Sequence, residues 1–144
     1  MKGLFRTLQL NFLPKCVDSG LLILRIALGA QMIYGHGWEK LMSFSAMAAT
    51  FPDPLGVGNK TSAVLAILGE VLCAALIAVG ALTRLAALGA MATMATAFFV
   101  VHRGQLTGEG NGELAFLYLI GFVVIFVSGA GRFSVDAKLG GGSA

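Results

Sequence analysis

Four long apolar segments, at residues 19–41, 61–81, 84–102 and 113–130, most constrain what this chain can fold into. Each is close to the roughly 20 residues with which a helix crosses ~30 Å of membrane hydrocarbon. The segments lack the strict alternation of apolar and polar residues that marks the strands of a membrane β-barrel. We therefore expect an all-α membrane protein, with residues 19–136 folded as a bundle of four transmembrane helices.

The composition supports lipid as the solvent of this chain. Only 12% of the residues are charged, against roughly 25% in ordinary globular proteins. Such a chain has too little polar surface to cover a soluble particle. The net charge of +3 is modest and scattered along the sequence, so it gives no indication of a nucleic-acid partner. Cys16 and Cys73 form no CxxC motif, and no thiol relay is expected from them.

The two ends of the chain differ from the apolar segments. Within residues 1–18, Leu4, Phe5 and Leu8 fall on one helical face, and Pro14 ends the pattern. This arrangement predicts an amphipathic helix that lies in the membrane interface. Residues 137–144 are rich in glycine and are expected to form a flexible tail.

The distribution of lysine and arginine predicts the orientation in the membrane. With four crossings, the termini and the short connection at 82–84 share one side, which carries six of these residues against three on the other. The positive-inside rule then places both termini in the cytoplasm. The six are Lys2, Arg6, Lys15, Arg84, Arg132 and Lys138, and the three are Lys40, Lys60 and Arg103.

Polar residues follow one face of the first predicted helix. At 3.6 residues per turn, Arg25, His36 and Lys40 share this face, and Arg25 is near the cytoplasmic end. A polar stripe that faced lipid would cost several kcal/mol per charge, so the stripe is expected to point into the bundle. The second helix carries Glu70 near its middle, and Arg25 is the predicted partner of this carboxylate. This pair either belongs to a proton path or only fixes the packing of the helices.

The third and fourth helices add polar groups at their outer ends. Arg84 and His102 are 18 residues apart, so they share a helical face at opposite ends of the third helix. Arg84 is expected to anchor the cytoplasmic interface by snorkelling. Asn111 and Glu113 open the fourth helix. Capping and the helix dipole alone can explain these two residues, but their level is again the outer face.

These residues together predict an outward-facing polar pocket. A metal site built on His36 and Glu39 is one interpretation, and a haem between His36 and His102 is another. A quinone headgroup fits better, because its carbonyl groups need hydrogen-bond donors and a proton relay. The predicted catalytic residues are His36, Lys40, His102 and Glu113. The predicted quinone-binding residues are Trp38, Glu39 and Asn111, and the structural or proton-path residues are Arg25, Glu70 and Arg84.

Five blocks of the sequence resemble the DoxX family (DoxX/DoxD-like) of small bacterial membrane proteins. The blocks are LRIALGAQMIYGHGWEKL, GEVLCAALIAVGALTRLAAL, FFVVH, NGELAFLYLIGF and GAGRFSVD. The resemblance implies a four-helix membrane bundle. It also implies a link to oxidoreduction, since some relatives, including the membrane subunit of thiosulfate–quinone oxidoreductase, have such a role. The positions that match the family's polar motifs are Arg25, His36, Gly37, Lys40, Glu70, Arg84, His102, Asn111, Glu113 and Arg132.

The sequence and the resemblance together predict an inner-membrane protein of quinone-linked redox metabolism. We expect it to oxidise a small substrate, with a sulfur compound as the candidate, at the outer face of the membrane. Lys40 is expected to attract an anionic substrate or a quinone oxygen, while His36 and His102 exchange protons and Glu113 orients a histidine. The alternatives are an accessory subunit of a membrane oxidoreductase and a small-solute transporter. The expected partners are membrane lipid, an oxidoreductase partner subunit and a second copy of the chain.

Overall fold

The structure, a computed structural model, describes residues 8–10 and 16–140, and these contain helices and no strand. The predicted interfacial helix at 1–18 lies for the most part outside the described residues. Within them, three apolar helices are long enough to cross a membrane: Val17–Met42, Asn59–Val79 and Thr83–Val101. These three confirm the predicted helical segments. The fourth apolar helix, Glu113–Ser128, has 16 residues and is shorter.

Each of the three long helices contains a π-helical segment. The first consists of α2 (Val17–Met32), η1 (Ile33–Gly37) and α3 (Trp38–Met42), and the short α4 (Phe44–Met47) follows it. The second consists of α5 (Asn59–Ile67), η2 (Leu68–Cys73) and α6 (Ala74–Val79). The third consists of α7 (Thr83–Ala95) and η3 (Thr96–Val101). The chain ends with α8 (Glu113–Ser128) and the short α9 (Val135–Leu139).

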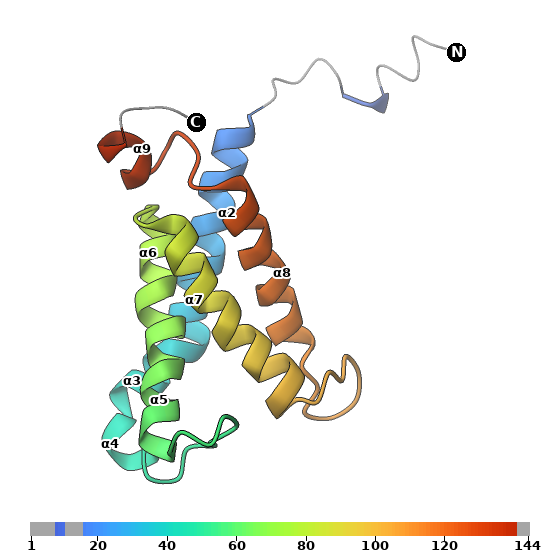
Figure 1. Cartoon of the computed structure of the whole chain (residues 1–144). Helices are drawn as coiled ribbons and strands as arrows, with labels where there is room; N and C mark the ends of the chain where they lie inside the picture. The colour runs from blue at the N-terminus through green and yellow to red at the C-terminus, as the bar shows by residue number, and fades with distance from the viewer. Residues whose placement is uncertain (1–7, 11–15, 141–144) are drawn as a thin grey trace.

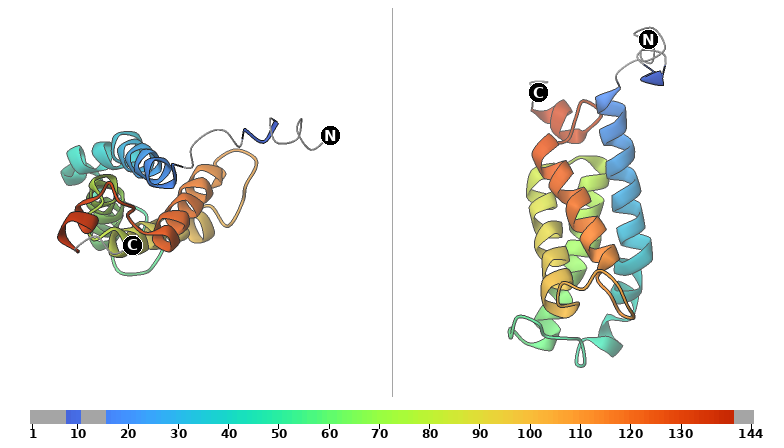
Figure 2. Two further views of the ribbon diagram at one scale, coloured as in Figure 1. Left: turned by 90° about the horizontal axis from the view of Figure 1, so that it is seen from above. Right: turned by 90° about the vertical axis from the view of Figure 1, so that its right-hand side faces the viewer.

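The helices pack side by side as an elongated bundle with the connecting loops at its two ends (Figures 1 and 2). The start of α2 and the helix α9 lie at one end, here called the terminal end. The loop that follows α4 and the loop between η3 and α8 lie at the other end, here called the loop end. The predicted inward face of the first helix is confirmed at Arg25, which is fully buried, whereas His36 and Lys40 are only partly buried.

Small residues bring the helices into close contact. A Cβ added to Gly29 of α2 would lie 2.6 Å from the carbonyl oxygen of Ala74 in α6, so these two backbones almost touch. In lipid, where apolar side chains gain little from leaving the solvent, such close packing is a main source of helix association. The core of the bundle includes the fully buried Ile77, Phe122 and Ile125.

The segment after α8 folds back over the terminal end and is held there by Arg25. The guanidinium of Arg25 is fully buried and donates from Nη2 to the carbonyl oxygen of Phe133 at 2.6 Å. The carboxylate of Asp136 accepts from the backbone N–H groups of Leu82 at 2.7 Å and Thr83 at 2.9 Å. Ser134 caps α9 by accepting from the N–H of Ala137 at 3.0 Å. The expected flexible tail is therefore wrong for residues 137–139, which belong to a capped helix, and 141–144 lie outside the described residues.

The contacts of Asp136 predict a pH dependence of stability. Burial alone would raise the pKa of this carboxyl, but the hydrogen bonds from Thr83 and Leu82 and the charge of Arg25 outweigh burial and lower the pKa. The unfolded chain has the ordinary pKa of about 3.9. Asp136 therefore adds stability above about pH 4, and this stability is lost as the pH falls through the folded pKa. We expect the melting temperature of the wild type in detergent to drop below about pH 4.

The variant Asp136→Asn isolates this contribution. It should melt at a lower temperature than the wild type at pH 6, and the difference between the two should shrink as the pH falls toward 3. A constant difference across this range would show that ionisation of Asp136 adds nothing to stability.

Candidate binding cavity around Lys40 and Glu70

An ion pair joins the first two long helices near the loop end. The ammonium nitrogen of Lys40, in α3, lies 2.5 Å from each carboxylate oxygen of Glu70, in η2. Glu70 is 5% exposed, while the side chain of Lys40 is 28% exposed. A carboxylate so deep in a membrane protein needs a partner or must be protonated, and Lys40 meets this need.

The predicted pair of Arg25 and Glu70 is wrong. Arg25 donates to the carbonyl oxygens of Phe133 and Ile77 at the terminal end, and Glu70 is bound by Lys40. Gly37 is the residue that makes the observed pair possible. A Cβ at this position would lie 2.9 Å from the carbonyl oxygen of Glu70, so the first helix passes directly beside the backbone of Glu70. Lys40 follows almost one turn later and reaches the carboxylate.

The three π-helical segments lie next to the polar residues of this region. His36 is in η1, Glu70 is in η2, and His102 directly follows η3. A π-helical turn holds more residues than an α-helical turn, so it changes the direction of the side chains that follow it, and such turns are frequent at functional sites. The sequence reasoning assumed a constant 3.6 residues per turn and missed all three segments.

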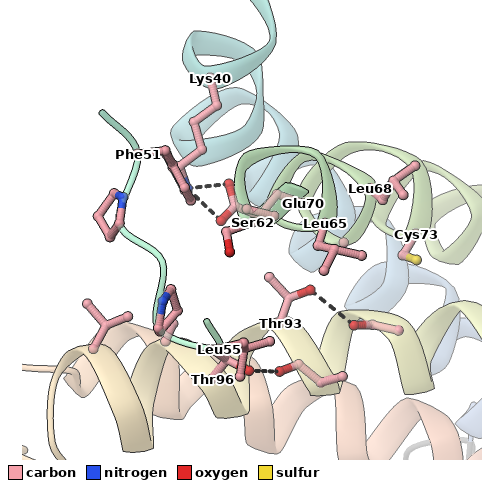
Figure 3. Close-up of a pocket in the computed structure, with 18 of the residues that line it drawn as sticks. Lys40, Phe51, Leu55, Ser62, Leu65, Leu68, Glu70, Cys73, Thr93 and Thr96 are labelled. Carbon is pink, nitrogen blue, oxygen red and sulfur yellow. Dashed lines mark hydrogen bonds and ion pairs between the residues drawn. The ribbon is translucent and has the colours of Figure 1, made fainter. Parts of the chain in front are cut away.

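A cavity of about 530 Å³ opens beside the ion pair, between α5–η2 on one side and α7–η3 on the other (Figure 3). Its lining is mostly apolar, and Phe51, Pro52 and Leu55 from the loop after α4 cover it. The polar side chains in its wall come from the three long helices and from the residue that follows the third. They are Lys40, Ser62, Glu70, Cys73, Thr93, Thr96 and His102.

The covering loop is pinned to the start of α5. The carboxylate of Asp53 accepts from the hydroxyl of Ser62 at 2.7 Å and from the N–H groups of Gly58 at 2.8 Å and Val57 at 3.0 Å. The hydrogen bond from Ser62 lowers the pKa of the Asp53 carboxyl most, and the bond from Gly58 has the next largest effect. Asp53 is therefore ionised at neutral pH, and it holds the loop over the cavity.

The structure separates the two histidines that the sequence placed in one pocket. His102 lines the cavity, and its ring atom Nδ1 lies 2.7 Å from the carbonyl oxygen of Gly110. Because a carbonyl oxygen can only accept, Nδ1 carries the proton and donates. His36 does not line the cavity. Its ring lies edge-on to the ring of Tyr118 in α8, with 5.7 Å between the ring centres.

The remaining predicted residues lie outside the cavity. Asn111 accepts from the N–H of Glu113 at 3.0 Å and donates to the carbonyl oxygen of Gly108 at 2.6 Å, so it shapes the start of α8. Glu113 is exposed, and its side chain makes no hydrogen bond with His102 among the described residues. Trp38 and Glu39 are exposed on α3.

Arg84 lies away from the cavity. It is exposed at the terminal end and donates to the carbonyl oxygen of Val127 at 3.4 Å.

Across residues 8–10 and 16–140, no three His, Cys, Asp or Glu side chains come together as ligands for a metal ion. Ser62, Thr93, Thr96 and Phe51 line the cavity without having been predicted, and their only signal in the sequence is their level near the loop end.

Comparison with known proteins places the chain in a family. The DoxX family model matches residues 20–103, which is more than half of the chain. A protein of Haemophilus influenzae, described as an uncharacterized protein, is 32% identical over 139 residues, which cover 90% of this chain and 97% of that protein. No solved structure matches. The family match, together with the long apolar helices, shows that this chain belongs to the DoxX family and is a membrane protein.

Proposed function

We propose that the protein takes part in quinone-linked redox metabolism and binds a quinone headgroup in the cavity beside Lys40 and Glu70. The observation that carries the proposal is a part-buried ion pair at one end of a mostly apolar cavity. The proposal also takes α8 as a fourth membrane crossing. It places the protein in the bacterial inner membrane with the terminal end in the cytoplasm.

The cavity suits such a ligand in size and lining. Its volume of about 530 Å³ lies within the range of roughly 300–1,000 Å³ typical of small-molecule sites, which combine apolar walls with a few polar groups. Leu65 and Leu68 belong to the wall and are 45% and 42% exposed, so this side of the cavity faces the lipid. An isoprenoid tail can leave the cavity along these two leucines, with its headgroup directed toward Lys40.

The residues of the cavity supply hydrogen bonds and proton exchange. A quinone, when bound, provides two-electron and two-proton chemistry. Lys40 carries N–H donors at the place where a carbonyl oxygen of the headgroup would lie. Glu70 holds or releases a proton at its carboxylate, and His102 offers Nε2, because Nδ1–H is already bound to Gly110. The loop residues Phe51 and Pro54 cover part of this end of the cavity and limit its contact with water.

The electron donor is proposed to arrive at the loop end. A small reduced compound, with a sulfur compound as the candidate, fits this direction because Lys40 and His102 both lie there. Lys40 would attract it, and Phe51 and Leu55 would keep it beside the quinone. A partner subunit docked on the loops at the same end would deliver electrons by the same route.

Binding of decylubiquinone to the purified protein in lipid nanodiscs tests the proposal. The double variant Lys40→Met, Glu70→Gln removes the charged donor and leaves no unpaired charge. A hydrogen bond from a charged group contributes about 1.5–3 kcal/mol, so we expect at least about tenfold weaker binding. Calorimetric titration of the nanodiscs gives the dissociation constants directly.

Two matched variants control for general effects of charge. Lys60→Met and Glu39→Gln remove a lysine and a glutamate that are exposed and do not line the cavity. Both should bind decylubiquinone as the wild type does. If the double variant binds equally well, or if the wild type does not bind this quinone, the proposed function is wrong.

A further inference from the structure

We propose that the polar end of the cavity binds a small anion together with one proton, the anion at Lys40 and the proton on Glu70. This inference deepens the proposed function by naming the class of the water-soluble reactant as an anion taken up with a proton. The charges and hydrogen bonds of the cavity wall support it, as follows.

The cavity wall is electrically neutral before a ligand enters. Lys40 is the only cation among the described residues of the wall when His102 is neutral, and Glu70 neutralises it. Both carboxylate oxygens of Glu70 lie 2.5 Å from the same ammonium nitrogen, so two of its three N–H donors are directed at Glu70. An anion that enters the cavity therefore competes with Glu70 for Lys40.

The other polar groups of the wall have little to offer an anion. The hydroxyl of Ser62 donates to Asp53, that of Thr93 to the carbonyl oxygen of Gly89, and that of Thr96 to the carbonyl oxygen of Ala92 (Figure 3 shows the last two bonds). The proton of His102 is used by Gly110. Lys40 is thus the group that can hold an anion here, and its side chain is exposed enough to be reached.

Displacement from Lys40 leaves Glu70 in an unfavourable state. Glu70 is 5% exposed, so an ionised carboxylate without a partner would pay a large desolvation cost. It would also stand beside the incoming anion, and two anions close to one ammonium repel each other. Protonation of Glu70 removes both costs, because the neutral acid no longer competes for Lys40. Binding of one anion therefore takes up one proton.

Among the titratable groups around Glu70, His102 is the one that competes with it as the proton acceptor, and the variants below distinguish the two. From η3 and the residue that directly follows it, His102 is the titratable group that lines the cavity, and its Nε2 is the competing site. From the first helix, His36 contacts Tyr118 and Glu39 is exposed. From the covering loop, Asp53 is held by Ser62, Gly58 and Val57. The polar side chains that α5 and α7 contribute to this wall are the hydroxyl groups of Ser62 and Thr93, and η2 adds the thiol of Cys73.

Calorimetric titration with thiocyanate measures the proposed coupling. The full-length protein in nanodiscs is titrated between pH 5.5 and 8 in buffers with different ionisation enthalpies, which reveals the number of protons taken up. We expect uptake of one proton for each thiocyanate bound. The dissociation constant should then rise about tenfold for each pH unit on the alkaline side of the titration, because one proton is linked to binding.

Three variants assign the proton to Glu70. Glu70→Gln resembles the protonated acid, so it should bind thiocyanate at pH 8 as tightly as the wild type binds at low pH, with no proton uptake. His102→Gln and Glu39→Gln should keep the proton uptake of the wild type. The double variant Lys40→Met, Glu70→Gln should lose saturable binding without leaving an unpaired charge. A size-exclusion profile and a helical circular dichroism spectrum identical to the wild type establish that each variant is folded.

Several results would overturn the inference. They are the absence of saturable thiocyanate binding to the wild type at pH 5.5, binding without proton uptake, and a pH dependence that persists in Glu70→Gln or disappears in His102→Gln. The quinone experiment is separate, because decylubiquinone is neutral. Proton-coupled anion binding without quinone binding would reject only the proposed redox function, and quinone binding without anion binding would reject only this inference.

Discussion

Gly80→Ala is expected to be the most damaging of the substitutions considered for the stability of the bundle. Gly80 ends α6 with φ at +74°, a region that costs a residue with a side chain roughly 1–2 kcal/mol. The added Cβ would also overlap the guanidinium of Arg25 and lie 2.6 Å from the Cβ of Ser134. Arg25 is fully buried and cannot move aside without losing its bond to Phe133. We expect a total loss of about 3 kcal/mol or more, measured by thermal unfolding in detergent.

Gly56→Ala separates backbone strain from the overlap with Arg25. Gly56 also has a positive φ, at +69°, but nothing lies within 4 Å of an added Cβ. This variant should lose only the cost of the strained backbone. If Gly80→Ala and Gly56→Ala have the same melting temperature, the packing of Gly80 against Arg25 contributes nothing to the fold.

Lys40→Met is expected to be the second most damaging of the substitutions considered. It leaves the carboxylate of Glu70, which is 5% exposed, without its partner. Removing one member of a buried pair costs about 3–5 kcal/mol in soluble proteins. Because the side chain of Lys40 is 28% exposed, water reaches the pair and the loss should be smaller, at about 1–3 kcal/mol. The melting temperature in detergent at pH 7 gives this loss.

A double variant shows whether the unpaired carboxylate causes the loss. Adding Glu70→Gln to Lys40→Met should restore most of the stability, since no buried charge is left alone. A double variant that is no more stable than Lys40→Met would mean that the lost interaction is packing and not charge.

Local patterns predicted the helices well, for reasons visible in single segments. The runs at 61–81 and 84–102 are apolar over the length of a membrane crossing, and the structure has helices at Asn59–Val79 and Thr83–Val101. The second and third long helices are separate because Gly80 and Leu82 adopt a left-handed backbone conformation. Gly80 ends α6, and Leu82 precedes the first residue of α7. Hydrophobic length is a property of consecutive residues, so sequence alone is enough to predict it.

The candidate site was predicted only in part. Lys40, Glu70 and His102 were recognised as polar groups within an apolar context, and all three line the cavity. His36 was placed with them because a regular helix puts residues 36 and 40 on one face. The π-helical segment η1, which contains His36 and ends at Gly37, breaks that regularity, and His36 contacts Tyr118 instead.

The sequence by itself determined that this chain is a helical membrane protein of the DoxX family, and which few residues bring charge into its apolar interior. Only the tertiary structure decided that Lys40, and not Arg25, neutralises Glu70. The choice depends on how far two helices rotate and how closely they approach at Gly37 and Gly29. Those quantities are set by contacts between residues far apart in the chain, which no local pattern of hydrophobicity contains.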